Sequence, residues 1–345
     1  MENVTRIGID LAKRVFHVTA VDVHGAVVER KRLRRAGLES YLARLPRGCM
    51  IAMEACGSAH HWGRLAQRLG HRPLLMSPQF VAPYVKSNKN DVQDADAIAE
   101  ASSRPTMRFV GVKSVAQQHL QQMHRVRQMA VRNRTAQCNQ VHGLLLEYGI
   151  DAPRGVGRLR RRLPEILEDA ANGLPIAARA LFAELGAELG KLDERVAVLD
   201  AQLAAMAGQL PSCQRLLTIP GVGVLTATAL VAAVGDATAF RNGRELAAWL
   251  GLVPRQHSTG GRPTLLGISK RGDRYLRTLL IHGARAALRG ARRRSDRRSR
   301  WALATAARRG TNVAAVALAN KNARTAWAVL ARGSRFDAEY IGSAA

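Results

Sequence analysis

The sequence predicts an α/β domain at the N-terminus, followed by a long helical segment and a mainly α-helical C-terminal domain. Three observations predict this order. Short apolar runs that alternate with polar residues dominate residues 1–76, as expected of half-buried strands. Apolar residues then recur every three or four positions over long stretches, as in helices. Small-residue turns and arginine-rich helical stretches fill the last third.

The N-terminal elements are expected in the order β-β-β-α-β-α-β. Ile7, Ile9 and Leu11 alternate with Gly8 and Asp10, which predicts a first strand with one buried face. The turn at residues 22–25 joins the next two strands as a hairpin. The other expected elements are strands at 15–21, 26–33, 50–54 and 74–76, and helices at 37–44 and 58–69.

Four carboxylates stand at the ends or beginnings of these elements. Asp10 lies in the first strand, and Glu54 closes the strand at 50–54. A helix is expected to begin near Asn90, and Asp91 and Asp94 share one face of it because they are three residues apart. Taken singly, Asp10 is more simply a strand-end turn residue and the aspartate pair a helix cap.

The order of the four acids resembles the ribonuclease-H-like nuclease domain of the RuvC type. The resemblance implies that the acids converge on a pair of magnesium ions. Hard oxygen ligands suit Mg²⁺, and a metal pair clamps the attacking and leaving oxygens in phosphoryl transfer. Asp96 is an additional acid on the same helix, and it points away from the face that Asp91 and Asp94 share.

Two long helices are expected in the middle of the chain. The first covers residues 114–148 and has a basic side. The second carries a heptad seam typical of coiled coils: Leu185, Leu189, Leu192, Val196, Leu199, Leu203, Met206 and Leu210. Its strictness favours pairing with another subunit over a hairpin with the first helix, so a homo-oligomer, dimer or tetramer, is expected. The basic connection at 151–164 is expected to be ordered only on nucleic acid.

The last third contains two motifs of interest. Residues 217–230 look like a helix-hairpin-helix turn, in which Gly221 and Gly223 would let the backbone approach a phosphate. A small-residue turn that packs helices is an equal alternative. Residues 251–262 form a polar loop around Ser258, and a turn with a satisfied serine is the simplest reading of its composition. Cations near Ser258 that would bind a phosphodiester are Arg255, His257, Arg262, Lys270 and Arg271.

The charge points to a polyanionic partner. The chain carries 53 Lys and Arg against 26 Asp and Glu, a net charge of +27. Residues 285–335 hold fourteen of these cations, Arg292, Arg293 and Arg294 among them, against the single acid Asp296. With no apolar run long enough to span a membrane and no signal peptide, a cytoplasmic, nucleoid-associated protein is expected. The four cysteines have neither zinc-site nor disulfide spacing.

Several motifs together resemble the DEDD transposases of insertion-sequence family one-ten, eleven-eleven subgroup. The match covers nearly the whole chain: G-I-D-L-A-K at 8–13, M-E-A-C-G-S-A-H-H-W at 53–62, N-K-N-D-V-Q-D-A-D-A-I-A at 88–99, I-P-G-V-G at 219–223, G-L-V-P-R-Q-H-S-T-G-G at 251–261 and A-V-A-L-A-N-K-N-A-R at 315–324.

The resemblance implies a DNA recombinase that excises and inserts a mobile element, guided by a structured RNA that the element encodes. It assigns the metal-binding tetrad, for Mg²⁺ or Mn²⁺, to Asp10, Glu54, Asp91 and Asp94. It assigns the nucleophile to Ser258, which would form a phosphoserine link to DNA; Thr259 is the neighbouring alternative. Donor and target DNA are the expected partners. The expected domains are a RuvC-like domain at 1–112, a helical coiled-coil segment at 113–212 and a transposase domain at 213–345.

Two other functions compete with this interpretation. A junction resolvase or nuclease with the same fold would use a metal-bound water, with Ser258 an ordinary loop residue. A non-enzymatic RNA-binding scaffold would use its acids only for folding.

Overall fold

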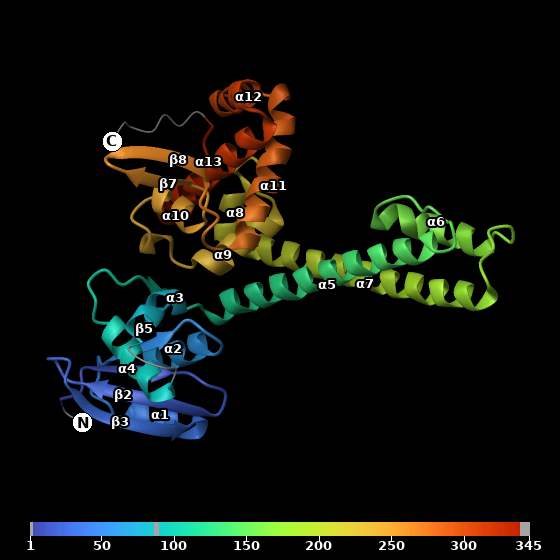
Figure 1. The fold of residues 1–345 in the computed structure, drawn as a ribbon. Helices are drawn as coiled ribbons and strands as arrows, with labels where there is room; N and C mark the ends of the chain where they lie inside the picture. Colours follow the sequence, from blue (N-terminus) through green and yellow to red (C-terminus); the bar gives the residue numbers. More distant parts are fainter. Residues whose placement is uncertain (1–2, 86–89, 339–345) are drawn as a thin grey trace. The chain divides into compact units, whose positions relative to one another are not determined.

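The structure is a computed structural model that describes residues 3–85 and 90–338. Asn88 and Lys89 of the motif at 88–99 therefore lie outside the described residues. The chain divides into two compact units, Met1–Ala116 and Gln117–Ala345, which are described separately (Figure 1). The boundaries expected after residues 112 and 212 stay a prediction. Within the described ranges, no helix is long and apolar enough to cross a membrane.

The first unit is built on a six-stranded sheet of order β3-β2-β1-β4-β5-β6. Strands β1, β2 and β3 are antiparallel, β4 and β5 run parallel to β1, and β6 is an antiparallel edge. The predicted β-β-β-α-β-α-β order is confirmed. The elements are β1 (Arg6–Asp10), β2 (Val15–Val21), β3 (Val27–Arg34), α1 (Arg35–Ala43), β4 (Met50–Glu54), α2 (Ala59–Arg68), β5 (Arg72–Met76), α3 (Pro78–Val81), η1 (Ala82–Tyr84), α4 (Asp91–Ala101) and β6 (Phe109–Val110).

The two faces of the sheet pack against different helices. Ile7 and Ile9 of β1 join a buried cluster with residues of α1 and α2, such as Leu38 and Leu65. Gly8 points to the other face, where it meets α4. Because side chains alternate along a strand, Asp10 lies on the same side as Gly8. The buried face and the face that carries the acid thus follow from one alternating sequence.

Gly8 sets the distance between the sheet and α4. A Cβ atom at this position would lie 2.3 Å from the backbone oxygen of Ala95 and 2.6 Å from the backbone nitrogen of Ala99. Only glycine opposite these two alanines permits so close an approach. The contact brings the first turn of α4 to the strand end at Asp10.

The second unit begins with a long antiparallel helix pair, α5 (Val115–Leu146) and α7 (Ile176–Gln209). Ion pairs between Arg127 and Asp200 and between Arg134 and Asp193 fix the register of the pair. The heptad seam of α7 buries Leu189 and Leu203 within its own chain, against residues of α5 such as Val141 and Leu120. The intrachain hairpin is therefore present, and the expected pairing between subunits stays a prediction.

The basic connection at 151–164 is mostly helical in the structure, contrary to expectation. Helix α6 spans Val156–Glu168 and includes Pro164. Leu159, Leu163 and Ile166 recur on one face and are buried in a cluster that includes residues of α5 and α7. Arg160 also pairs with Asp193 of α7 at 2.7 Å. The apolar spacing within the arginine-rich stretch accounts for the helix without nucleic acid.

The C-terminal part of this unit is mostly helical, as predicted, with one added hairpin (Figure 1). Its elements are α8 (Pro211–Leu217), α9 (Val224–Val234), η2 (Ala237–Ala239), α10 (Gly243–Trp249), β7 (Pro254–Thr259), β8 (Arg262–Ile268), α11 (Arg274–Gly290), η3 (Ala291–Arg293), α12 (Arg297–Arg309) and α13 (Thr311–Arg332). The polar loop expected at 251–262 is instead the first strand and turn of the β7–β8 hairpin.

The turn at 219–223 packs against another helix of the unit. Gly221 has φ +88°, and a Cβ atom there would lie 2.6 Å from the backbone oxygen of Gly283 in α11. Asn322 of α13 donates a hydrogen bond to the backbone oxygen of Pro220 at 3.1 Å. These contacts account for the small residues by helix packing, and the helix-hairpin-helix role of Gly221 and Gly223 stays a prediction.

A buried polar network joins three helices of this unit. His124 of α5 is hydrogen-bonded through Nδ1 to the Tyr275 hydroxyl of α11 and through Nε2 to Thr228 Oγ1 of α9, both at 2.9 Å. Thr228 donates its own proton to the backbone oxygen of Val224. It therefore accepts from His124, and Tyr275 donates to Nδ1. The network requires a neutral imidazole, and burial lowers the pKa of His124 to about 4.

Candidate acidic metal centre and serine hairpin

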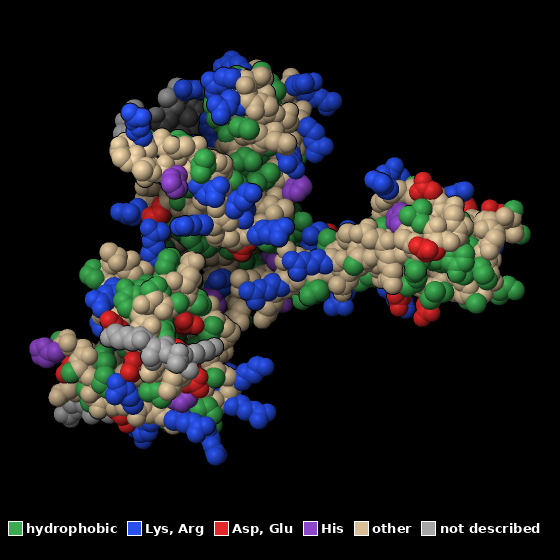
Figure 2. Space-filling view, viewed as in Figure 1, with side chains coloured by type: hydrophobic (Ala, Val, Ile, Leu, Met, Phe, Trp, Pro, Cys, Tyr) green, Lys and Arg blue, Asp and Glu red, His purple; other side chains and the backbone are tan. Residues whose placement is uncertain are grey.

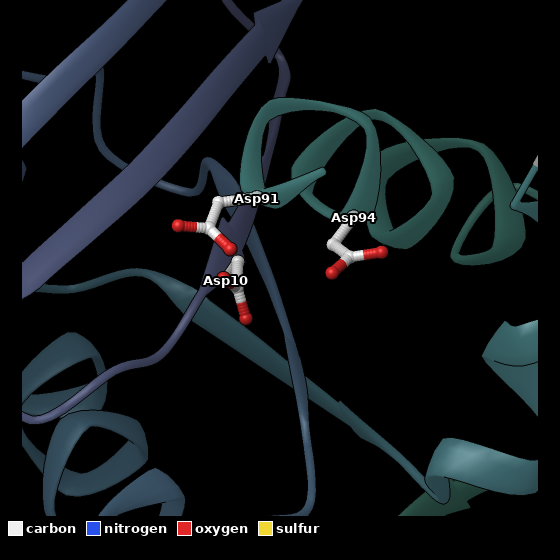
Figure 3. A group of neighbouring side chains, drawn as sticks. All are labelled: Asp10, Asp91 and Asp94. Atoms are coloured by element: carbon white, nitrogen blue, oxygen red, sulfur yellow. The ribbon is translucent and has the colours of Figure 1, made fainter. Parts of the chain in front are cut away.

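Three of the four predicted acids meet where β1, a central strand of the first unit's sheet, ends (Figure 3). Asp10 ends β1, and Asp91 and Asp94 lie in the first turn of α4. One carboxylate oxygen from each lies within 4.8 Å of the other two. Asn90 caps the helix by accepting a hydrogen bond from the backbone of Val92 at 3.1 Å, which fixes where that first turn begins.

Glu54 lies beside this cluster, on the neighbouring parallel strand. Ile9 of β1 is in register with Met53 of β4, so Asp10 and Glu54 occupy the next position at the ends of both strands. Burial raises the pKa of the nearby Cys56 thiol, and the charges of Glu54 and then Asp10 raise it further. Both carboxylates therefore act on the same thiol, although Glu54 is not one of the three acids that converge most closely.

The donor set fits a hard divalent cation. Three carboxylates supply oxygen ligands, the type that Mg²⁺ and Mn²⁺ take in proteins. The side chain of Asp91 is 65% exposed, so a bound ion would keep room for water and for a substrate phosphate. The structure thus brings Asp10, Asp91 and Asp94 together, and their role as metal ligands stays a prediction.

Asp96, the additional acid, is held away from this centre. It accepts a hydrogen bond from Thr19 Oγ1 at 2.7 Å, and its carboxylate receives two nitrogens of the Arg30 guanidinium at 2.9–3.3 Å. Thr19 is on β2 and Arg30 on β3, so this pairing ties α4 to the antiparallel strands. The structure thus separates Asp96 from Asp91 and Asp94, as the helical spacing predicted.

Two features beside the acids were missed by sequence reasoning. His17 of β2 lies directly opposite Asp10, and its Nδ1 atom is 3.7 Å from Asp91 Oδ2. A hollow of about 370 Å³ opens where the end of β1 meets the start of α2, and its lining includes Lys13, Arg35 and Ser58. The antiparallel register of β1 and β2, which the short connection at residues 11–14 determines, was the signal that would have placed His17.

The predicted nucleophile lies on the exposed β7–β8 hairpin of the second unit. Gln256 Nε2 donates a hydrogen bond to Ser258 Oγ at 2.8 Å, so both side chains point to one face. Alternation places His257 and Thr259 on the opposite face, and Arg262 stands opposite Thr259. Ser258 therefore shares its face with an amide, whereas His257 and Arg262 lie on the other side.

The base of the hairpin is fixed by close backbone contacts. Gly251 has φ +71°, and a Cβ atom there would lie 2.0 Å from the backbone oxygen of Arg271. Asn320 of α13 donates to the backbone oxygen of Leu252 at 3.1 Å, and Arg277 donates to that of Leu250 at 3.1 Å. Gly251 of the motif at 251–261 and Asn320 of the motif at 315–324 thus anchor the hairpin.

The other predicted nucleic-acid contacts are spread over the second unit. Lys270 and Arg271 lie at the base of the hairpin, about five residues or roughly 16 Å along the strand from the level of Ser258. Arg255 lies at the irregular start of β7. Arg292, Arg293 and Arg294 are exposed at the junction between α11 and α12. The structure does not bring these side chains together with Ser258.

Comparison with known proteins decides the family. Residues 213–300 match the transposase family IS116/IS110/IS902, and residues 7–150 match a second transposase family model, of the DEDD type. A probable family 20 transposase from Pseudomonas aeruginosa is 53% identical over 331 residues, which cover 96% of this chain and 98% of that protein. The chain belongs to this transposase family.

Two further transposases match this chain over nearly its full length. The transposase for insertion sequence element IS1111A from Coxiella burnetii is 48% identical, covering 96% of this chain and 91% of the relative. The transposase for IS1328 from Yersinia enterocolitica is 45% identical, covering 97% and 99%. A transposase cleaves and rejoins DNA, so the chain is an enzyme that acts on DNA. The DEDD family also suggests a divalent metal, in agreement with the acidic cluster.

Proposed function

We propose that this transposase excises and inserts its element with two chemical parts, a divalent-metal centre on Asp10, Glu54, Asp91 and Asp94 and a nucleophile on Ser258. The convergence of three acids at the end of the central strand β1 is the observation that carries the first part. The hairpin that presents Ser258 to solvent supports the second, because a phosphodiester in duplex DNA can only meet an exposed nucleophile.

When bound, Mg²⁺ or Mn²⁺ at the acids would neutralise charge on the scissile phosphate. The acids' own task is to hold oxygen ligands in fixed positions. Asp10 is fixed by the sheet, and Asp91 and Asp94 by the packing of α4 over Gly8. His17 contacts Asp91 from the neighbouring strand, which restricts the orientation of the most exposed of the three carboxylates.

The serine step exchanges one phosphodiester for another. Ser258 Oγ attacks the phosphorus atom, the bond from phosphorus to one deoxyribose oxygen breaks, and that oxygen takes up a proton as the serine loses its own. The product is a phosphoserine bond between protein and DNA. A hydroxyl of a second DNA end then attacks that phosphorus and restores the serine, so the number of phosphodiester bonds is unchanged and no nucleotide is hydrolysed.

Gln256 is proposed to position the nucleophile. Its amide donates to Ser258 Oγ, which leaves the serine's proton directed away from the amide. The contact selects one orientation of a side chain that is otherwise exposed to solvent.

We further propose that target choice rests on a structured RNA encoded by the element. The charge of +27 supports binding of polyanions, RNA as well as DNA. Base pairing would supply the sequence specificity while the protein binds backbone and shape, as in other RNA-guided systems. The half-buried residues of the α7 seam, such as Leu192 and Leu199, support a further subunit contact in this assembly.

The experiment is to trap covalent protein–DNA adducts on a nicked suicide substrate. Wild type and Thr259→Ala are expected to form the adduct, whereas Ser258→Ala is not. An adduct that persists in Ser258→Ala but disappears in Thr259→Ala moves the nucleophile by one residue. Metal-dependent cleavage without an adduct in any variant favours the resolvase with a water nucleophile. RNA binding without cleavage in wild type favours the scaffold.

A further inference from the structure

Helices α12 and α13 gather positive charge in one place. The residues, called the cation cluster below, are Arg297, Arg298, Lys321 and Arg324. Burial lowers the pKa of Lys321, and the charges of the three arginines lower it further. Each of the three arginines therefore lies within electrostatic range of Lys321. Such a cluster is unfavourable by itself and becomes favourable when an anion binds.

Arg298 is the buried base of the cluster. It is only 8% exposed, and its Nε and Nη2 atoms have no hydrogen-bond partner among the described residues. Its guanidinium stacks 5.1 Å from the centroid of the Phe336 ring, and burial lowers its pKa to about 10. Asp296 is used as the cap of α12, since it accepts from the backbone and hydroxyl of Ser299 at 2.9 and 2.7 Å. A buried guanidinium with two unsatisfied nitrogens needs a reason other than stability.

An exposed aromatic ring lies next to the cluster. Trp301 is one turn beyond Arg297 on α12, and 38% of it is exposed. The ammonium of Lys321 lies 4.6 Å from the centroid of the Trp301 ring. Phosphate-binding cations beside an exposed aromatic ring are the combination that single-stranded nucleic acid uses, because the ring stacks on an unpaired base.

We propose that the cation cluster binds a backbone phosphate of single-stranded nucleic acid and that Trp301 stacks on the neighbouring base. Figure 2 shows Lys and Arg side chains over α12, on the part of the surface where an anionic chain would be attracted. The exposed members, Arg297 and Arg324, contact the phosphate directly, and buried Arg298 adds positive potential beneath it. This inference takes from the proposed function only that the ligand is a nucleic acid.

A single strand fits better than a duplex. The bases of a duplex are stacked on one another and are not free to stack on Trp301, whereas an unpaired segment offers both faces. Loops of a structured RNA and DNA strands opened during exchange both provide such segments. The shared chemistry is one phosphate with one unstacked base.

The test measures binding of one short labelled oligonucleotide as single-stranded DNA, single-stranded RNA and duplex DNA, by fluorescence anisotropy over a range of salt concentrations. The variants are Arg297→Gln, Lys321→Gln and Trp301→Ala. The control is Arg308→Gln in the last turn of the same helix, 11 residues and about 16 Å from Arg297.

Arg297→Gln is expected to reduce the salt dependence on single strands by about 0.7 in log–log slope, the value of one phosphate contact, and Lys321→Gln, which removes charge but no direct contact, is expected to reduce it less. Trp301→Ala is expected to weaken single-strand binding about tenfold and duplex binding much less. Equal losses in Arg308→Gln, or equal losses on duplex DNA, overturn the proposal. Arg297 is exposed, so its substitution does not disturb packing; if Lys321→Gln lowers the melting temperature, Lys321→Arg must restore binding.

Failure of this proposal can be told apart from failure of the proposed function. Ser258→Ala should bind every oligonucleotide as wild type does while forming no adduct. The absence of an adduct in wild type, together with losses in Arg297→Gln and Trp301→Ala, would contradict the serine mechanism and leave the binding site intact. An adduct in wild type with no loss of binding in these variants would support the serine mechanism and contradict the binding site.

Discussion

The acidic centre and the serine hairpin are held in opposite ways. The acids lie where α4 packs on β1, and the glycine at the contact leaves no room for a methyl group. The hairpin is a two-stranded sheet whose β7 residues are all exposed, and it is anchored at its base. Packed contacts define side-chain positions closely, whereas an isolated hairpin is only marginally ordered by itself. The fold therefore preorganises the acids of the proposed metal centre, and the proposed nucleophile Ser258 is expected to gain its final position from bound nucleic acid.

The largest expected effect is the difference in DNA cleavage between substitutions of Asp94 and Asp96, two aspartates of α4 that are two residues apart. Asp94→Asn should lower DNA cleavage by more than about 100-fold, since disturbing even an outer-shell partner of a metal costs 10–100-fold. Asp96→Asn should leave cleavage within a few-fold of wild type and lower stability by about 1 kcal/mol through its half-exposed contacts with Arg30 and Thr19. Strand-cleavage rates and urea unfolding measure the two effects, and similar losses of cleavage would contradict this site.

The next effect tests the packing that preorganises the acids. Gly8→Ala should destabilise the protein by about 1–3 kcal/mol, because the new methyl group overlaps the α4 backbone. It should also displace Asp91 and Asp94 from Asp10 and reduce cleavage. Gly37→Ala in α1 is the control, since nothing lies within 4 Å of a Cβ atom there. Wild-type stability and cleavage in Gly8→Ala would show that the close contact does not hold the centre.

A pH-dependent change in stability is expected from the second unit, and it does not involve the acids of the first unit. Burial lowers the pKa of His124 from 6.5 to about 4, with Arg127 adding to the shift and Asp200 opposing it. The unfolded chain then binds the proton more tightly, so stability is fully present above pH 6.5 and is lost as the pH falls towards 4, by up to about 3 kcal/mol. Urea unfolding of His124→Gln should show a weaker dependence over this interval; an unchanged dependence would assign it to other groups.

The smallest effect concerns the hairpin. Gln256→Ala should slow adduct formation about two- to tenfold, the value of one hydrogen bond, without changing stability. Gln256→Glu is a useful companion, because a carboxylate accepts and cannot donate to the serine oxygen. Rates equal to wild type in both variants would remove Gln256 as a positioning residue.

Sequence reasoning succeeded where local pattern determines geometry. Alternation around Asp10 and the three-residue spacing of Asp91 and Asp94 fixed which face each side chain occupies, and the element order placed Glu54 on the adjacent strand. It failed where tertiary contacts decide. The pairing of Asp96 with Arg30, the position of His17 and the packing of the arginine-rich helix α6 depend on strand register and helix contacts. The sequence did not show which side chains share a face of the β7–β8 hairpin, because residues 251–262 were interpreted as a loop.

The most direct test of the proposed metal centre measures Mn²⁺ binding without any substrate. Electron paramagnetic resonance detects the ion that stays free in solution. Wild type and Asp96→Asn are expected to bind Mn²⁺ alike, and Asp10→Asn and Asp94→Asn should lose that binding while melting as wild type does. Equal Mn²⁺ binding by wild type and Asp10→Asn would contradict the assignment of these acids to a metal.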